Sequence, residues 1–336
     1  MQWNKGFSSK FYGSFIDPVS WRDIERFEIT GGSIKRSDSG TNCSAEIDCT
    51  SYDQSTERWV RIWLDAEQSG SSDHVALFTG LATAPEREVE GINRSTNKVT
   101  CYSTLKPCQD VLLPLGYYAM AGVSGAKLVK DLLTEITPAP VEMEENSPAL
   151  SQYIVAEDNE SYLSMVEKIL SAIGWKIRIH GDGTIEICSM STTPKASFDM
   201  LENDSLEPKL KATNDWYDCP NVFRAILEDT SAVAKDESEK NPLSIPNRGR
   251  EVWLEERDCN LNANETLAEY AYRRLKEEQR HYLSVSYDRR FDPNILASDV
   301  IRLHYPSIGI DGLFYVSEQS IELGYGAKTS EEVIQI

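Results

Sequence analysis

Alternation of apolar and polar residues along short segments is the feature that most constrains the fold of this chain. The strongest such segment is "RWVRIWLDAE", residues 58–67. Val60, Ile62 and Leu64 fall on one face of it, and Trp59, Arg61 and Trp63 fall on the other. A period of two is typical of half-buried strands. The same period recurs near both ends of the chain, so we predict antiparallel β-structure there.

A hairpin is predicted in "ASDVIRLHYPSIGIDGLFYVSEQSIELG", residues 297–324. Two alternating runs flank Pro306, which cannot donate to a strand ladder and therefore ends the first run. Gly309 and Gly312 suit backbone with a positive φ. The turn of this hairpin is therefore expected between Pro306 and Gly312.

The middle of the chain follows a helical period instead. "SGAKLVKDLLTEI" (124–136) and "ESYLSMVEKILSAIG" (160–174) each place apolar residues on one helical face, with Ser124 as a cap and Gly174 as a stop. A hairpin follows in "WKIRIHGDGTIEICSM", turning at residues 181–183. A further amphipathic helix is predicted in "ANETLAEYAYRRLKEEQRH" (263–281), and the segments 137–148 and 231–249 are predicted to be polar loops.

Three units follow from this order of patterns. Residues 1–105 are predicted to be a β unit, residues 106–205 a small α+β unit, and residues 206–336 a second β unit with an inserted helix. Short strands at this spacing are typical of a barrel or a sandwich. The fold class is therefore α+β, mostly β.

The net charge is strongly negative. The chain has 54 acidic and 34 basic residues, a formal charge of −20. A general nucleic-acid binder needs a basic stripe to neutralise phosphates, so that class is excluded. The acids either form an ordinary solvated surface or let a polyanion pass nearby without sticking, because like charges repel.

Membrane insertion, secretion and a disulfide framework are not indicated. No apolar run approaches the ~20 residues that cross a bilayer, and the segment "MQWNKGFSSKFYGSF" lacks the pattern of a signal peptide. We therefore expect folding in a cytoplasm. The seven cysteines are widely spaced and form no C-x-x-C pair, so we interpret them as reduced, buried thiols. They are Cys43, Cys49, Cys101, Cys108, Cys188, Cys219 and Cys259.

A search for catalytic or ligand-binding motifs gives no positive prediction. The four histidines lack metal-ligand spacing, and neither a nucleophile elbow nor a phosphate-binding loop occurs. They are His74, His180, His281 and His304. Acidic clusters at Glu86, Glu88 and Glu90 and at Glu142, Glu144 and Glu145 match a glycosidase by residue type alone. We therefore predict no catalytic, cofactor-binding or metal-ligating residue, no cofactor, and no enzymatic activity.

The order of elements resembles phage tail baseplate hub proteins of the late-control-protein-D type, which also occur in contractile injection systems and phage-tail-like bacteriocins. That family has a short motif before its C-terminal hairpin, and this motif is matched by Pro293, Leu296, Asp299 and Val300. The hairpin itself is matched by Gly312, Tyr315, Val316 and Ile321. Ser298 stands where the family usually has glycine. Upstream, "RWVRIWLDAEQSGSSDHVALFTGLATAPE" and "ESYLSMVEKILSAIGWKIRIHGDGTIEI" resemble the first barrel and the middle unit of such hubs.

The resemblance implies an architectural function. Both β units would be tube-like antiparallel β-barrels, and a homotrimer would arrange six of them in a pseudo-sixfold ring. This ring would join the sixfold tail tube to a threefold spike or tip, help nucleate tail assembly, and pass DNA or effector through a negative bore. The expected partners are tail tube, spike or tip and other baseplate proteins, without sequence-specific nucleic acid or direct membrane insertion. The expected location is the virion tail, after assembly in the host bacterial cytoplasm.

Several alternatives stay open at this point. Many members of the resembling family in long flexible tails carry a C-terminal peptidase or hydrolase. The sequence ends at Ile336 soon after the hairpin, so we expect the spike to be a separate chain. A tail-tip carbohydrate-binding or adhesion module is favoured if Trp59, Trp63 or Trp253 share an exposed face. A cell-wall hydrolase is favoured if two carboxylates meet in a deep cleft. The sequence does not distinguish a contractile from a flexible tail, or a phage from a bacteriocin or an injection system. It does not identify the host or the receptor.

Overall fold

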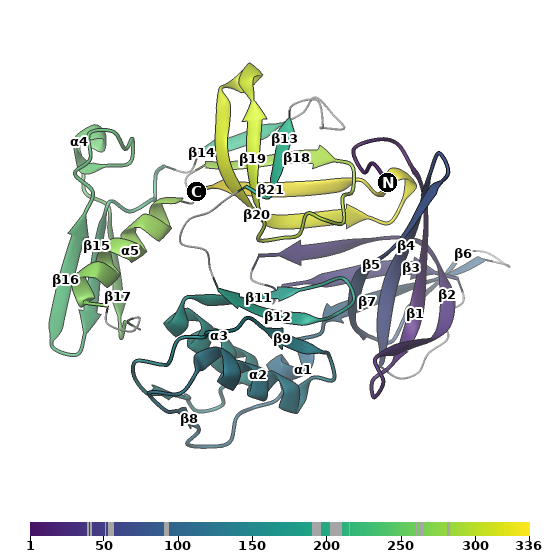
Figure 1. Cartoon of the computed structure of the whole chain (residues 1–336), viewed down its shortest axis with the longest axis horizontal. Helices are drawn as coiled ribbons and strands as arrows, with labels where there is room; N and C mark the ends of the chain where they lie inside the picture. The colour runs from purple at the N-terminus through teal and green to yellow at the C-terminus, as the bar shows by residue number, and fades with distance from the viewer. Residues whose placement is uncertain are drawn as a thin grey trace.

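The computed structural model shows a mostly β protein with helices, which confirms the predicted α+β class (Figure 1). It describes residues 1–38, 40, 42–50, 52, 57–90, 94–189, 196–201, 210–214, 216–259, 261, 265–280 and 283–336. Four separate apolar cores lie in the described parts of the chain. The fold is therefore best followed one core at a time.

The first core lies inside a closed cycle of six antiparallel strands. Each strand pairs with the next in the order β1-β4-β5-β7-β3-β2, and β2 pairs back to β1. The strands are β1 (Ser8–Asp17), β2 (Arg22–Ser37), β3 (Ser44–Cys49), β4 (Arg58–Gln68), β5 (Ser71–Ala82) and β7 (Arg94–Ser103), and β6 (Glu86–Glu90) pairs with β7 outside the cycle. The predicted apolar face of β4 points inward, since Val60, Ile62 and Leu64 are buried in this core.

The second core belongs to the middle unit, where helices cover a small sheet. The helices are α1 (Lys106–Asp110), α2 (Gly125–Ile136) and α3 (Tyr162–Ile173), and the strands are β8 (Tyr118–Ala119), β9 (Val141–Met143), β10 (Ile154–Val155), β11 (Trp175–Ile179) and β12 (Ile185–Ser189). As predicted, the Ser124 hydroxyl accepts a hydrogen bond from the Lys127 amide, and Gly174 ends α3 with a φ of 66°. The prediction of an unstructured loop over 137–148 is wrong, because Val141 and Met143 pair in parallel with β12.

The third core lies in the C-terminal β unit. Its strands follow the order β13-β19-β20-β21-β18-β14. Their bounds are β13 (Phe198–Leu201), β14 (Lys211–Asn214), β18 (Leu283–Arg289), β19 (Val300–Tyr305), β20 (Ile310–Glu322) and β21 (Thr329–Gln335), with single helical turns at Pro306–Ile308 and Tyr325–Ala327. The predicted hairpin is β19–β20, and Gly309 has the expected positive φ of 73°. The turn prediction is wrong for Gly312, which lies within β20 opposite Leu303.

The fourth core forms a small unit that stands apart at the left of Figure 1. It contains β15 (Val222–Leu227), β16 (Thr230–Lys235), α4 (Ile245–Arg248), β17 (Trp253–Arg257) and α5 (Leu267–Arg280). The predicted polar loop 231–249 is wrong at its start, because Ala232 and Ala234 pair with β15 and pack into this core. The predicted inserted helix, α5, therefore comes with a three-stranded sheet of its own.

Asp236 ties this small unit together and gives a testable pH dependence. Burial alone would raise the pKa of the Asp236 carboxyl, but hydrogen bonds from Ser238 and Asn241 and the charge of Lys276 outweigh it and lower the pKa. Stability from this ionised group is therefore present above about pH 4 and is lost as pH falls through the lowered pKa. We expect Asp236→Asn to lower the free energy of unfolding by about 2 kcal/mol at pH 7, and by less at pH 3. Urea unfolding at the two pH values checks this, with the exposed Glu237→Gln as the control.

Candidate functional site

One continuous sheet joins the two β units. The first half of β2 pairs with β1, whereas Ser33–Ser37 at its end pair with Glu318–Glu322 of β20. Strand β20 in turn pairs through its first half with β19 and along its length with β21. The sheet therefore runs unbroken through β7-β3-β2-β20-β21-β18-β14, from the first unit to the C-terminal one (Figure 1). We call this the joint sheet.

The outward face of the joint sheet is polar and negative. Cross-strand partners form three rows that cross the boundary between the units. The rows are Thr100–Glu46–Ser33–Glu322, Tyr102–Ser44–Lys35–Ser320–Ser330–Asp288 and Ser37–Glu318–Glu332–Ser286–Lys211. They hold five carboxylates against two lysines, and serine or threonine fills most other positions. Such a face stays hydrated and repels polyanions.

A shallow groove of about 330 Å³ lies at the centre of this face. Glu318 and Glu332 are direct cross-strand partners there, and Lys35 and Ser37 of the first unit line the same groove. Like charges placed opposite each other on a sheet weaken strand pairing. The pairing of β20 with β21 therefore gains no stability from placing Glu318 opposite Glu332.

Behind the joint sheet lies a buried ionic network. The Glu331 carboxylate accepts hydrogen bonds from Arg289, Tyr287 and Gln319, and the Arg289 and Glu331 side chains are 3% and 0% exposed. These residues come from three neighbouring strands, β18, β20 and β21. The network therefore fixes the C-terminal half of the joint sheet from inside.

The middle unit docks on the first β unit through the turn at 181–183. The Asp182 carbonyl accepts hydrogen bonds from Trp21 Nε1 (3.1 Å) and Arg61 Nη2 (2.9 Å), and the Gly181 carbonyl accepts one from Thr79 Oγ1 (2.8 Å). A Cβ on Gly181 would lie 1.9 Å from the Ala76 carbonyl oxygen, so no side chain fits there. The glycines predicted for a simple turn also permit this close contact between units.

The middle unit also contacts the C-terminal β unit. Arg178 forms an ion pair of 3.0 Å with Asp299, and Lys176 Nζ donates to the Ser298 carbonyl. Ser298 has a φ of 72°, and its buried hydroxyl has no hydrogen-bond partner. Ser298, which stands where the resembling family usually has glycine, thus has a left-handed backbone.

Ser298→Gly is expected to be neutral or to raise the free energy of unfolding by about 1 kcal/mol. A left-handed backbone is unfavourable for serine by roughly 1–2 kcal/mol, and glycine removes both this strain and the unpaired hydroxyl. Denaturant unfolding measures the change. Ser298→Ala is the matched control, since it removes the hydroxyl but keeps the strain. A glycine variant less stable than the alanine variant would contradict the argument.

Solved structures of other proteins align with nearly the whole chain. A tail protein from Neisseria meningitidis MC58 aligns with a TM-score of 0.71 at 13% identity, over 99% of this chain and 97% of that chain. The 43 kDa tail protein of prophage MuSo2 from Shewanella oneidensis gives 0.70 at 12% identity, over 98% of both chains. The chain has the fold of phage tail proteins. This confirms the predicted resemblance at the level of the fold.

The tail-protein fold extends to a secretion machine. An E. coli component of the type VI secretion system, structurally similar to bacteriophage T4 tail proteins, aligns with a TM-score of 0.54 at 10% identity, over 92% of this chain and 74% of that one. No protein-family model and no curated protein matches the sequence. The fold, rather than sequence identity, carries the relationship.

The histidines of this tail-protein fold are held by nearby carboxylates. His74 contacts Asp65 at 2.6 Å, His180 contacts Glu186 at 3.0 Å, and His304 contacts Asp311 at 3.5 Å. His74 and His304 are the direct cross-strand partners of those aspartates, which is ordinary pairing on the surface of a sheet. His281 lies outside the described residues.

The predicted acidic clusters do not form a cleft where the structure describes them. The Glu144 carboxylate accepts hydrogen bonds from the amide and the hydroxyl of Ser189, so it fastens β9 to the end of β12. Glu142 and Glu145 are exposed in the middle unit, and Glu86 is exposed at the start of β6. The side chains of Glu88 and Glu90 are outside the described part.

The three tryptophans do not share one exposed face. Trp59 is buried against Trp21 with ring centroids 5.4 Å apart, and Trp63 stacks on His74 at 4.1 Å. Trp253 lies in the separate sheet, beneath the Arg224 guanidinium. The condition that favoured a carbohydrate-binding module is therefore not met.

All seven cysteines are buried, and none forms a disulfide. Burial raises the pKa of Cys101 to about 12 and the pKa of Cys49 to about 11, which keeps both protonated and unreactive. In the parts of the chain that the structure describes, no cluster of His, Cys, Asp and Glu could hold a metal ion, and no helix is long and apolar enough to span a bilayer.

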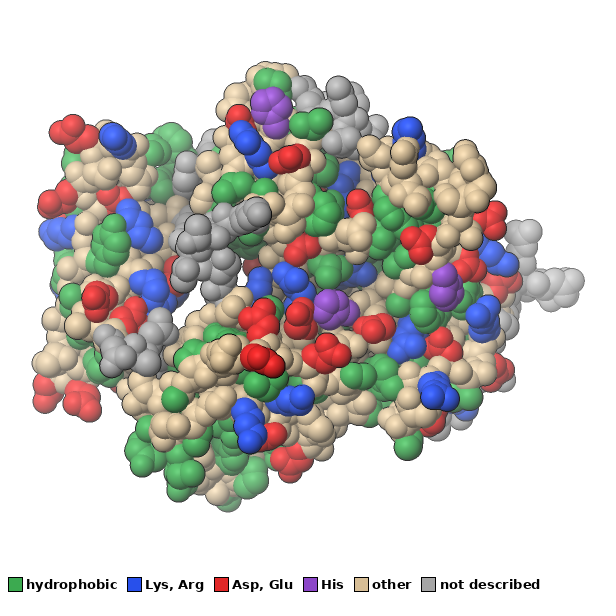
Figure 2. All heavy atoms as spheres, viewed as in Figure 1, with side chains coloured by type: hydrophobic (Ala, Val, Ile, Leu, Met, Phe, Trp, Pro, Cys, Tyr) green, Lys and Arg blue, Asp and Glu red, His purple; other side chains and the backbone are tan. Residues whose placement is uncertain are grey.

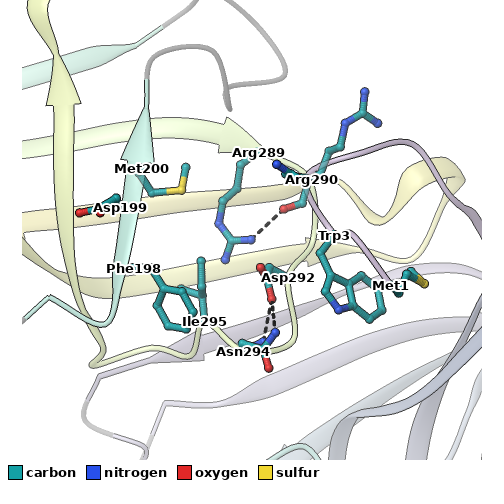
Figure 3. A pocket seen from close by; sticks show the side chains of 11 residues that line it. Met1, Trp3, Phe198, Asp199, Met200, Arg289, Arg290, Asp292, Asn294 and Ile295 are labelled. Carbon is teal, nitrogen blue, oxygen red and sulfur yellow. Dashed lines mark hydrogen bonds between the residues drawn. The ribbon is translucent and has the colours of Figure 1, made fainter. Parts of the chain in front are cut away.

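A cavity of about 380 Å³ lies between the N-terminal residues and the C-terminal β unit (Figure 3). Its lining includes Trp3, Phe198, Arg289, Asp292 and Ile295. Arg289 donates to the Arg290 carbonyl as well as to Glu331, and Asp292 accepts from Asn294. Figure 3 shows the Arg290 guanidinium extending away from the other labelled side chains. Arg289 and Asp292 thus already have hydrogen-bond partners within the protein.

Proposed function

We propose that this chain is a structural tail hub protein. The observation that carries the proposal is the joint sheet, which makes two β units of one chain into one continuous sheet with a polar, negative outward face. The tail-protein fold supports it. Both β units are tube-like barrels in this proposal. It keeps the predicted units 1–105, 106–205 and 206–336, except that β13 joins the C-terminal β unit.

Three copies would then close a ring in which the joint sheets face the bore. Each chain supplies two β units, so a homotrimer presents six and can join a sixfold tail tube to a threefold spike or tip. The serine and carboxylate rows would line the bore and let DNA or effector pass without sticking. Tube, spike and other baseplate proteins are the partners, the virion tail is the location, and assembly takes place in the host cytoplasm.

The proposed role is mechanical and has no catalytic residue, metal or cofactor. The buried thiols, the carboxylate-bound histidines and the dispersed acids supply no assembled reaction centre in the described residues. Contact with DNA would be passive and independent of sequence. Neither the carbohydrate-binding module nor the hydrolase gains a specific supporting observation.

Mass measurement across a salt series tests the hub proposal. We expect a particle of three times the 37.8 kDa chain that becomes more populated as salt screens the −20 charge of each copy. Electron microscopy of that particle should show a threefold ring with the joint sheets inward. A strict monomer at every salt concentration, or tight salt-resistant binding to random duplex DNA, would overturn the proposal.

A further inference from the structure

The middle unit exposes a cluster of large apolar side chains that the hub proposal does not use. Figure 2 shows hydrophobic side chains gathered at the lower left of the molecule, around the position of β8 in Figure 1. We call this cluster the apolar patch. Its members range from 40% exposed at Val111 to 86% at Leu115. They are Val111, Leu112, Leu115, Tyr118, Met120, Tyr153 and Val155.

The apolar patch is built on a fixed backbone. Tyr118 and Ala119 pair with Val155 and Ile154 across β8–β10, and the Ala156 amide donates to the Tyr117 carbonyl. The chain around Val111 is held as well, since the Tyr162 amide donates to its carbonyl and the Leu113 amide donates to the Glu160 carbonyl. The exposed side chains are therefore presented in a defined arrangement, which lowers the entropy lost on binding.

Core packing does not explain these residues. Ala119 and Ile154 point inward and are buried in the core of the middle unit, while their neighbours Tyr118, Tyr153 and Val155 point outward and are equally apolar. Between Asp110 and Lys127 the sequence has no charged residue, although 26% of the whole chain is charged. Contiguous apolar surface beyond a few hundred Å² on a soluble protein marks an interaction site.

Carboxylates adjoin the apolar patch, and we call them the rim. Asp110 directly precedes Val111, and Glu157 and Asp158 follow Val155 after one residue. On α2, Asp131 and Glu135 act electrostatically on the Tyr117 hydroxyl, and their charges contribute to the raised pKa of Tyr117, for which burial is the main cause. Of the lysines near the rim, Lys106 is paired with Asp110, and Lys168 with Glu157 and Glu160. Helix α2 also carries Lys127 and Lys130, so the carboxylates near the patch outnumber the lysines by six to four.

We propose that the apolar patch docks a different protein, through a segment whose apolar side chains are flanked by lysine or arginine. Charge decides between occupants. A second copy of this chain, docked patch to patch, would set two acidic rims against each other, and an anionic lipid surface would meet the same repulsion. A basic-flanked segment covers the apolar side chains and pairs with the rim. This inference rests on the surface of the middle unit alone and stands whether or not the chain forms a ring.

Fluorescence anisotropy of the full chain with labelled twelve-residue peptides tests the proposal. The probe carries a Leu-Tyr-Val-Leu core flanked by lysines, and the comparison peptides have glutamate flanks, or lysine flanks around a serine core. We expect the probe to bind at least tenfold more tightly than either comparison peptide. Leu115→Ser combined with Tyr153→Ser should weaken probe binding about tenfold, whereas Val19→Ser combined with Tyr325→Ser, which removes two exposed apolar side chains elsewhere, should not change it.

The rim is tested separately by Asp131→Asn combined with Asp158→Asn. Both carboxylates are exposed, and this double variant should weaken probe binding about threefold at low salt but little at 1 M salt. Equal binding of the probe to wild type and to the Leu115/Tyr153 variant would overturn the proposal, as would equal binding of the glutamate-flanked peptide. It is also overturned if the Leu115/Tyr153 variant loses self-association in sedimentation, or loses binding to phosphatidylcholine or phosphatidylglycerol vesicles that the wild type shows.

Discussion

Glu331→Ala is expected to lower the free energy of unfolding of the C-terminal β unit by about 3–5 kcal/mol. The substitution leaves the Arg289 guanidinium, only 3% exposed, without the carboxylate that neutralises it. It also removes the acceptor for Tyr287 and Gln319, so two further buried polar groups lose a partner. An uncompensated buried charge is among the most destabilising single changes known for proteins. Urea unfolding, combined with hydrogen exchange of β18 and β21, measures the loss.

Glu332→Ala is the matched control for that experiment. It removes the same side chain one residue further along β21, but from the outward face, where Glu332 opposes Glu318. We expect a change within about 0.5 kcal/mol, with relief of like-charge repulsion favouring the variant. The double replacement Arg289→Met with Glu331→Leu should recover much of the loss, because apolar residues can replace a buried ion pair. Equal losses for Glu331→Ala and Glu332→Ala would contradict the buried network.

Gly181→Ala is expected to separate the middle unit from the first β unit. The added methyl group would lie 1.9 Å from a backbone oxygen of β5, which cannot swing away as a side chain would. Relief requires the turn to withdraw, and that breaks the hydrogen bonds from Trp21, Arg61 and Thr79. Overpacking of this kind lowers the free energy of unfolding by about 3 kcal/mol. Faster hydrogen exchange at residues 76–79 and 181–184 would report the separation directly.

Gly6→Ala serves as the control for a glycine without such a contact. The nearest atom to its added methyl group would be 4.0 Å away, on the side chain of Arg290. We expect no change in exchange at the turn and little change in unfolding. If Gly181→Ala behaved like Gly6→Ala, the turn would not be a close contact between the two units.

The strands that alternation predicted are those with one face in a core. Strand β4 and the hairpin β19–β20 follow the pattern because their inward residues are apolar and their outward residues are mostly polar. Alternation does not predict strands β9 and β16, since each is short and lies in a segment rich in acids, prolines or both. Glycine suits turns, so the sequence favours a turn at Gly312, but pairing with Leu303 keeps this residue within β20.

The joint sheet could not be derived from the sequence, because it depends on pairing between residues 33–37 and 318–322. Local patterns predict that a strand exists but do not identify a partner that far along the chain. The same holds for the contacts of Asp182 and Asp299 with other units. The sequence held one sign of the contact between the middle unit and the C-terminal β unit. Ser298 stands where the resemblance leads us to expect glycine, and Ser298 is next to Asp299, which forms an ion pair with Arg178.

Strand β2 links the time course of synthesis to the assembly of the molecule. A ribosome that adds about 5–20 residues per second needs roughly ten to forty seconds to go from residue 105, where the first cycle of strands is complete, to residue 322. Throughout that interval the end of β2 lacks β20 as its partner, and an unpaired strand edge invites pairing with other chains. Nascent chains on neighbouring ribosomes would then meet while these edges are open. Slower translation across residues 106–317 should therefore increase aggregation, even though every residue of the finished protein is unchanged.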